Sequence, residues 1–439
     1  MLRKTLQLCL ATALLAFTVV PSPLSAQPVS VMAEPPSASG HGSEVGRTPV
    51  AVPEPSEKAR RYYRSSNILW IVNQLLGVLI PLAILFTGLS ATLRNVAARI
   101  GRNWFFVVAI YSILLGVVTF LIDLPMSYYM GYVRQHAYGL SNQTFGKWSS
   151  DQLKALMVAL VVNALVLWVP FLLIRKSPRR WWLFTGLALF PFVIVSILVA
   201  PVLIDPLFNK FGPMKDRVLE TEILSLAGRA GIDGARVYEV DKSLDTKTVN
   251  AYVTGLGRTK RIVLWDTTLT KLTPPQVLSI MGHEMGHFVL GHVRQLTMAI
   301  CVFLIAGLYF VHRTSGALLQ RYGQRWGVTS LADVASLPLM TLLLGLALFV
   351  MTPAINAITR HNEHEADRFA LEITRDNRNA ALAFVKLQQE NLAIPRPGLV
   401  RKIFRESHPP LGERIDFANR YRPWETGQTL RYGERFRAK

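Results

Sequence analysis

The chain has 439 residues, of which 51% are hydrophobic and only 17% charged, and its formal net charge is +20 at pH 7. The apolar residues come in long runs, and about 20 consecutive apolar residues are enough for a helix to cross a bilayer. The first interpretation is therefore a membrane protein, and not an ordinary soluble protein. Many Lys and Arg residues flank the apolar runs, as topology determinants do, so the charge does not indicate nucleic-acid binding. The two cysteines, Cys9 and Cys301, predict neither a disulfide framework nor a metal site.

The first residues have the pattern of a secretory signal. Arg3 and Lys4 precede an apolar stretch over 6–20, which ends at Ser25-Ala26. Residues 1–26 are therefore predicted to be a signal peptide or an N-terminal anchor. Residues 27–62 are rich in Pro and Ser and predict a disordered linker.

Six apolar runs follow and predict six membrane-spanning helices. Four of them lie within residues 63–204 and two within 296–358, separated by a polar segment over 205–295 and followed by a polar remainder over 359–439 that is expected to be helical. The expected spans are roughly 68–89, 104–124, 156–174, 181–203, 296–311 and 337–358.

The polar segment over 205–295 predicts a small α+β unit. A helix is expected over 215–230, and β-branched and aromatic residues predict short strands over 236–239, 249–253 and 261–265, the last two forming a hairpin. Thr273-Pro274-Pro275-Gln276 has the pattern of a helix start, with a cap, an early proline and a Gln three residues on. The helix that follows is expected to continue to His292.

That helix carries the sequence His283-Glu284-Met285-Gly286-His287. Two His residues four apart lie on one helical face and can bind one metal ion, while Glu284 can polarise a metal-bound water. Because the chain has only nine histidines, a chance match has a probability on the order of one in a hundred. Two unrelated surface histidines are the alternative, and they do not explain Gly286 or the span that follows.

Zinc in such a site needs a third protein ligand and leaves one position open for water. A His six residues after His287 would be one possibility, but that position is Val293, and His292 is expected to lie at the helix end. The other possibility is a carboxylate from a second helix. Glu363 and Asp367 are four apart, so one can bind the metal while the other orients an imidazole. Spacing alone leaves Glu365 open as the ligand; Glu365 and His364 are otherwise expected to be solvated.

A last polar cluster combines His408, which precedes two prolines, with Arg414. One interpretation is a turn before a final helix. The other is a pair of groups that stabilise a developing oxyanion. The residues alone do not choose between them.

Taken together, these features resemble the type I CAAX prenyl protease family and its HtpX-like bacterial relatives, from about residue 63 to about 417. The prenyl protease branch is the more similar one. The segments that carry the resemblance, in order, are 138–144, 206–211, 250–253, 261–266, the 283–287 motif, Arg360 with Glu363, Ala366 and Asp367, and 408–410 with Arg414.

The resemblance implies a mainly α fold, in which a polytopic membrane helical chamber holds a small α+β metalloprotease domain of the gluzincin type. It implies one Zn²⁺ per chain, bound by His283, His287 and Glu363, with Asp367 as a supporting residue. His408 and Arg414 are implied to stabilise the tetrahedral intermediate. Asn250, Ala251 and Tyr252 are implied to form the edge strand on which a peptide lies. Residues 205–295 then form the zinc-protease domain, and 359–439 its C-terminal helical part with the third ligand.

The sequence thus predicts a membrane zinc metalloendopeptidase that acts on peptides or proteins and contacts lipid. Glu284 is the expected general base. A transporter or channel, or an inactive membrane chaperone, are the alternatives, but neither explains the intact 283–287 motif. The expected location is a bacterial inner membrane, with the active site facing the periplasm because basic loops gather on the other side. The family itself has a cytosolic active site, and a basic cluster over 58–64 also favours that orientation.

Overall fold

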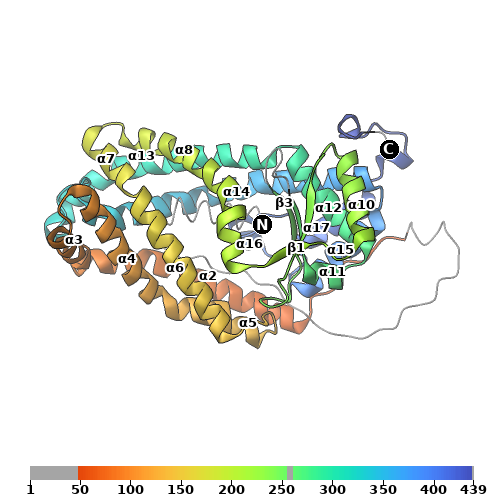
Figure 1. Cartoon of the computed structure of the whole chain (residues 1–439), viewed down its shortest axis with the longest axis horizontal. Coiled ribbons are helices and arrows are strands. Elements are labelled where there is room, and N and C mark those ends of the chain that lie inside the picture. Colours follow the sequence, from red (N-terminus) through yellow and green to blue (C-terminus); the bar gives the residue numbers. More distant parts are fainter. Residues whose placement is uncertain (1–47, 255–260, 438–439) are drawn as a thin grey trace.

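The computed structural model describes residues 48–254 and 261–437. A bundle of long helices forms one end of an elongated molecule, and a small sheet with short helices around it forms the other end (Figure 1). Helices α13 and α14 run between the two ends and connect them. The predicted signal over 1–26 lies outside the described residues.

The long helices are built from the apolar runs. Among the described residues, five helices are long and apolar enough to cross a membrane, and a bent pair, Trp181–Ile197 and Ala200–Phe208, makes a sixth candidate. The prediction of a multi-span protein is therefore confirmed. The helices of this part are α2 (Glu57–Phe86), α3 (Leu89–Ile100), α4 (Trp104–Tyr128), a π-helix (Tyr129–Val133), α5 (Arg134–Ala137), α6 (Phe145–Val166), α7 (Trp168–Lys176), α8 (Trp181–Val199), a second π-helix (Ala200–Ile204), α9 (Asp205–Phe208), α13 (His292–Trp326), a 3-10 turn (Val334–Ser336) and α14 (Leu337–Thr374).

Small residues let the helices of the bundle approach closely. A Cβ on Gly307 of α13 would lie 2.7 Å from Leu344 Cδ1 of α14, too close without a shift. Such contacts are typical of helix packing in membranes, where apolar surface alone does not drive association. Large apolar side chains such as Phe171 and Trp181 fill the rest of the bundle core.

The sheet has four strands in the order β1-β2-β4-β3. β2 and β4 are parallel, while β3 and β4 are antiparallel, so the predicted pairing of the last two strands is confirmed and β3 is a terminal strand. The residues that join β3 to β4, 255–260, lie outside the described residues. The strands are β1 (Phe211–Pro213), β2 (Arg236–Val240), β3 (Ala251–Thr254) and β4 (Arg261–Trp265). The short helices are α10 (Arg217–Arg229), α11 (Asp266–Lys271), α12 (Pro274–Val289), α15 (Asn377–Glu390), α16 (Leu399–Phe404) and α17 (Leu411–Arg420), with 3-10 turns at Pro423–Glu425 and Gly433–Arg435.

The core beneath the sheet fixes the position of α12. Ile262 and Leu264 of β4 pack with Met281 and Met285 of α12 and with Phe369 of α14, and all five are essentially buried. One face of α12 is therefore covered by the sheet and by α14. The histidines of α12 project beside this covered face, toward the carboxylates of α14.

Two expectations about element ends are wrong. The helix expected to reach His292 ends at Val289, because Gly291 takes a left-handed φ of 69° and starts α13 in a new direction. The expected linker over 27–62 is ordered from residue 48 onward. Its end packs on α15 and α17, where Gln388 donates to the Pro53 carbonyl (2.7 Å) and Asn419 to the Val50 carbonyl (2.9 Å), and α2 begins at Glu57.

Candidate active site

Helix α12 and helix α14 lie in unusually close contact. A Cβ on Gly286 would be 3.2 Å from Ala366 Cα, and one on Gly282 would be 3.3 Å from Ala370 Cα. Glycine at these two positions therefore lets the helix backbones approach. This approach brings the histidines of α12 within reach of the carboxylates of α14.

Three side chains converge where the two helices meet. His283 Nε2 and His287 Nε2 are 3.1 Å apart, and the Glu363 oxygens lie 3.2 Å from the first and 3.4 Å from the second. One ligand atom from each lies within 4.8 Å of the others. Two imidazoles and one carboxylate are the donor set of a catalytic zinc site.

The chemistry of these donors fits a metal ion. Glu363 Oε2 is buried and has no hydrogen bond of good geometry among the described residues, and its close neighbour at 3.2 Å is Nε2 of His283, another member of the converging set. A buried carboxylate oxygen without a hydrogen-bond donor is costly unless a cation compensates its charge. The residues present therefore fit the divalent metal that their types and spacing predict.

Asp367 and Arg414 hold the other side of His283. Asp367 Oδ1 lies 2.8 Å from His283 Nδ1, and Arg414 donates to both carboxylate oxygens, at 2.8 Å from Nε and 2.5 Å from Nη2. All three side chains are buried. Asp367 thereby fixes the tautomer that leaves Nε2 free for a metal.

The same contacts set the proton affinity of His283. Burial lowers the pKa of this imidazole, but the hydrogen bond and the charge of Asp367 outweigh burial and raise the pKa to about 9. A cation that binds His283 Nε2 must therefore displace a proton, so metal affinity is expected to fall as the pH is lowered.

His292 contacts the second histidine of the motif. It is buried, and its Nδ1 lies 3.0 Å from His287 Nδ1. The sequence interpretation placed His292 only at a helix end and gave it no role at the site. The signal in the sequence was a third His five residues after His287. Whether this His contacts His287 depends on the turn at Gly291, which the sequence pattern alone does not give.

His408 reaches the site from the segment before α17. Its Nε2 lies 3.2 Å from Glu363 Oε1, and Ser407 Oγ is 3.0 Å from its Nδ1. Arg360 of α14 anchors this segment by donating to the carbonyls of Lys402 and Glu406, both at 2.8 Å. His408 is about half exposed, so it is accessible to a molecule beside Glu363.

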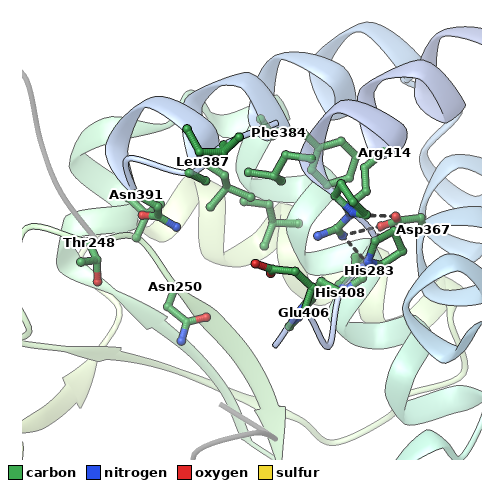
Figure 2. Close-up of a pocket in the computed structure, with 18 of the residues that line it drawn as sticks. Thr248, Asn250, His283, Asp367, Phe384, Leu387, Asn391, Glu406, His408 and Arg414 are labelled. Carbon is green, nitrogen blue, oxygen red and sulfur yellow. Dashed lines mark hydrogen bonds and ion pairs between the residues drawn. The ribbon is translucent and has the colours of Figure 1, made fainter. Parts of the chain in front are cut away.

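A cavity of about 440 Å³ opens beside these groups (Figure 2). His283, Glu284, His408 and Arg414 line it on one side, and Asn250 with Ala251 at the edge strand β3 line it on another. Tyr252 has its side chain on the other face of the sheet, packed with Val263 and Trp265. Only the backbone of Tyr252 therefore belongs to the edge.

Glu365 and His364 are not the solvated residues that the sequence suggested. Glu365 is buried and accepts hydrogen bonds from Tyr432 and Arg368, with Arg431 Nε at 3.0 Å. The His364 ring packs on Phe417 with ring centres 4.3 Å apart. Glu365 belongs to a separate polar cluster, and Glu363 is the carboxylate that meets the histidines.

Fold and site together define a membrane-embedded metallopeptidase, in which a helix with a His-Glu-x-x-His motif faces a glutamate on a second helix. The chain belongs to peptidase family M48. The model for that family matches residues 213–422, and the model for the CAAX prenyl protease N-terminal region, with five membrane helices, matches residues 49–210.

Individual proteins show the same similarity. The uncharacterized metalloprotease YhfN of Bacillus subtilis is 35% identical over 375 residues, which cover 85% of this chain and 88% of that protein. CAAX prenyl protease 1 of Saccharomyces cerevisiae is 29% identical over 321 residues, covering 69% of this chain and 70% of that protein. The crystal structure of S. mikatae Ste24p has a similar fold, with a TM-score of 0.70 at 25% identity over 82% of this chain and 87% of that chain.

Proposed function

We propose that this metallopeptidase is a zinc-dependent endopeptidase, with one zinc ion held by His283 Nε2, His287 Nε2 and Glu363. The observation that carries the proposal is the convergence of these three donors around a buried carboxylate oxygen that lacks a hydrogen bond. Two histidines and one glutamate are the three protein ligands that a catalytic zinc site uses, so these side chains would hold the ion. The cavity beside them is open to a peptide.

Zinc held by these three side chains would supply Lewis-acid chemistry toward water and a peptide carbonyl. Glu284 lies next to His283 on α12 and lines the cavity, but it does not belong to the converging triad. It accepts the proton of the attacking water and returns it to the leaving amine. His408 donates from Nε2 to the charge that develops on the carbonyl oxygen.

Arg414 has a supporting part in this mechanism. Its Nε and Nη2 both donate to Asp367, and its Nη2 is also 3.3 Å from His283 Nδ1. These contacts favour a role in holding Asp367 and His283 in place. We propose this positioning of Asp367 and His283 as the main role of Arg414, and stabilisation of the oxyanion as a secondary one.

The substrate peptide is proposed to add to the sheet at β3. This strand is terminal in the strand order, and its first residue, Ala251, lines the cavity together with Asn250. An extended peptide on such an edge gains main-chain hydrogen bonds that do not depend on its sequence. A peptide or protein is therefore the expected substrate, bound next to Glu284.

Purified protein is expected to cleave internal bonds of a peptide panel in a metal-dependent manner. A zinc chelator should abolish cleavage, and about one equivalent of zinc should restore it. The reason is that the buried carboxylate and the two imidazoles can act on the attacking water only through the metal that they hold. Mass spectrometry of the products identifies the bonds cut. Cleavage that persists in excess chelator would contradict the proposal.

We further propose that the site faces the periplasm of a bacterial inner membrane. Helix α3 and the end of α7 lie at the end of the bundle away from the sheet (Figure 1), and both carry basic residues. Basic loops favour the cytoplasmic side. The basic side chains that follow this rule are Arg94, Arg99, Arg102, Arg175, Lys176, Arg179, Arg180, Arg313, Arg321 and Arg325.

Alkaline phosphatase fused after Lys439 is accordingly expected to be active, while green fluorescent protein fused there should not fluoresce. Fusions after residue 178, between α7 and α8, should give the reverse pattern and serve as the internal control. A fluorescent, phosphatase-negative fusion at Lys439 would place the site in the cytosol.

A further inference from the structure

Helix α15 forms a cavity wall across from the edge strand β3. Phe384 lies on the part of this wall close to the metal ligands, because Arg414 Cζ is 4.2 Å from the centre of its ring and Arg414 Nη2 is 3.3 Å from His283 Nδ1. Leu387 and Asn391 follow three and seven residues later and also line the cavity. Residues with this spacing share one helical face, so the wall extends from the metal site toward Asn391.

Asn391 presents its amide to the cavity. Figure 2 shows it across the cavity from Thr248 and Asn250, with its nitrogen toward the open space. Its Oδ1 is buried and has no hydrogen-bond partner among the described residues. Asparagines at helix ends ordinarily use the side chain to bond nearby backbone groups. The Asn391 oxygen makes no such bond, so capping the helix does not explain this residue.

The turn after Asn391 is strained and anchored. Leu392 has a φ of 41°, a left-handed conformation that glycine usually adopts at the end of a helix. The residue here is a leucine, and its side chain is buried in a cluster with Ala59, Tyr62 and Leu140. The Ala393 N–H closes the turn on the Gln388 carbonyl at 3.0 Å. Backbone strain that the surroundings enforce is a frequent feature of binding sites, and here it fixes the direction of Asn391.

We propose that Asn391 is a substrate-binding residue whose amide nitrogen donates to a main-chain carbonyl of an extended peptide lying between β3 and α15. Seven residues of helix rise about 10 Å, and an extended peptide advances about 3.3 Å per residue. Asn391 therefore contacts the peptide about three residues from the scissile bond. The site then binds extended peptides. It favours peptides that are long enough to reach Asn391 on one side of the scissile bond. This inference rests on the proposed peptidase function.

The test uses full-length, zinc-loaded protein and one parent peptide that the wild type cleaves at a single bond. Truncated versions keep either one or at least four residues on each side of that bond. Asn391→Asp keeps the shape and removes the donor, and Asn391→Ala removes the amide. Gln389→Ala is the matched control, because Gln389 is an exposed amide residue in the last turn of the same helix.

Both Asn391 variants are expected to lower kcat/KM roughly five- to tenfold on the long peptides, the loss of about one hydrogen bond. They should leave the shortest peptides, zinc content and thermal midpoint unchanged, and Gln389→Ala should match the wild type throughout. An equal loss on short and long peptides would indicate a structural role and overturn the inference, as would unchanged cleavage of long peptides. Absence of chelator-sensitive cleavage by the wild type would instead refute the peptidase function itself, and this inference with it.

Discussion

Replacing Glu284 by Gln is expected to leave the protein with one bound zinc ion and to lower peptide cleavage by roughly 10²- to 10⁴-fold, the usual contribution of a general base. Glu284 lines the cavity beside His283 but lies outside the triad of His283, His287 and Glu363. Glutamine has the same shape and no basic carboxylate. The metal site should therefore persist while proton transfer fails.

Metal analysis and peptide cleavage, measured on the same preparation, separate the two functions. His283→Ala is the matched control, because it removes a metal ligand on the same turn of α12 and should lose both zinc and activity. If Glu284→Gln lost zinc to the same extent as His283→Ala, Glu284 would be a ligand and its role as the base would be wrong.

Replacing Glu363 by Ala is expected to weaken zinc binding by more than the roughly 10- to 100-fold that loss of an outer partner costs, and to abolish cleavage. Both Glu363 oxygens lie within 3.4 Å of a histidine nitrogen of the triad. Without this carboxylate only two protein ligands remain, one fewer than a catalytic zinc site requires.

Glu365→Ala is the control, two residues along the same helix and equally buried. It should keep its zinc but lower the thermal midpoint, because it leaves Arg368 and Tyr432 without their shared acceptor. Competition with a chromophoric chelator gives the two zinc affinities, and calorimetry gives the thermal midpoints. Equal zinc affinity in the two variants would refute the assignment of Glu363.

Features with a local physical cause were predictable from the sequence. Length and hydropathy determine which segments can cross a bilayer, and each expected span coincides largely with a candidate membrane helix, although the span over 68–89 runs past the end of α2 at Phe86 and the span over 181–203 crosses the break of the bent pair. The antiparallel pairing of β3 and β4 follows from two short β-branched runs separated by a turn-like sequence. The convergence of His283 and His287 is local as well, because a spacing of four residues places both on one face whatever surrounds the helix. The spacing of Glu363 and Asp367 also pointed to the second helix, but the choice of Glu363 over Glu365 came from the resemblance.

The tertiary structure decided whatever depends on two segments meeting. Glu363 and Glu365 differ by two helical residues, about 200° around the helix axis, so only the rotation of α14 against α12 selects Glu363 for the triad. Gly282 and Gly286 set that packing, through close approach to a helix some 80 residues later in the chain. The contact between His287 and His292 depends on the left-handed turn at Gly291. The position of Asn391 depends on Leu392, which is anchored by residues from α2 and Leu140. No local pattern encodes such contacts, since their free energy comes from partners that only the folded chain brings together.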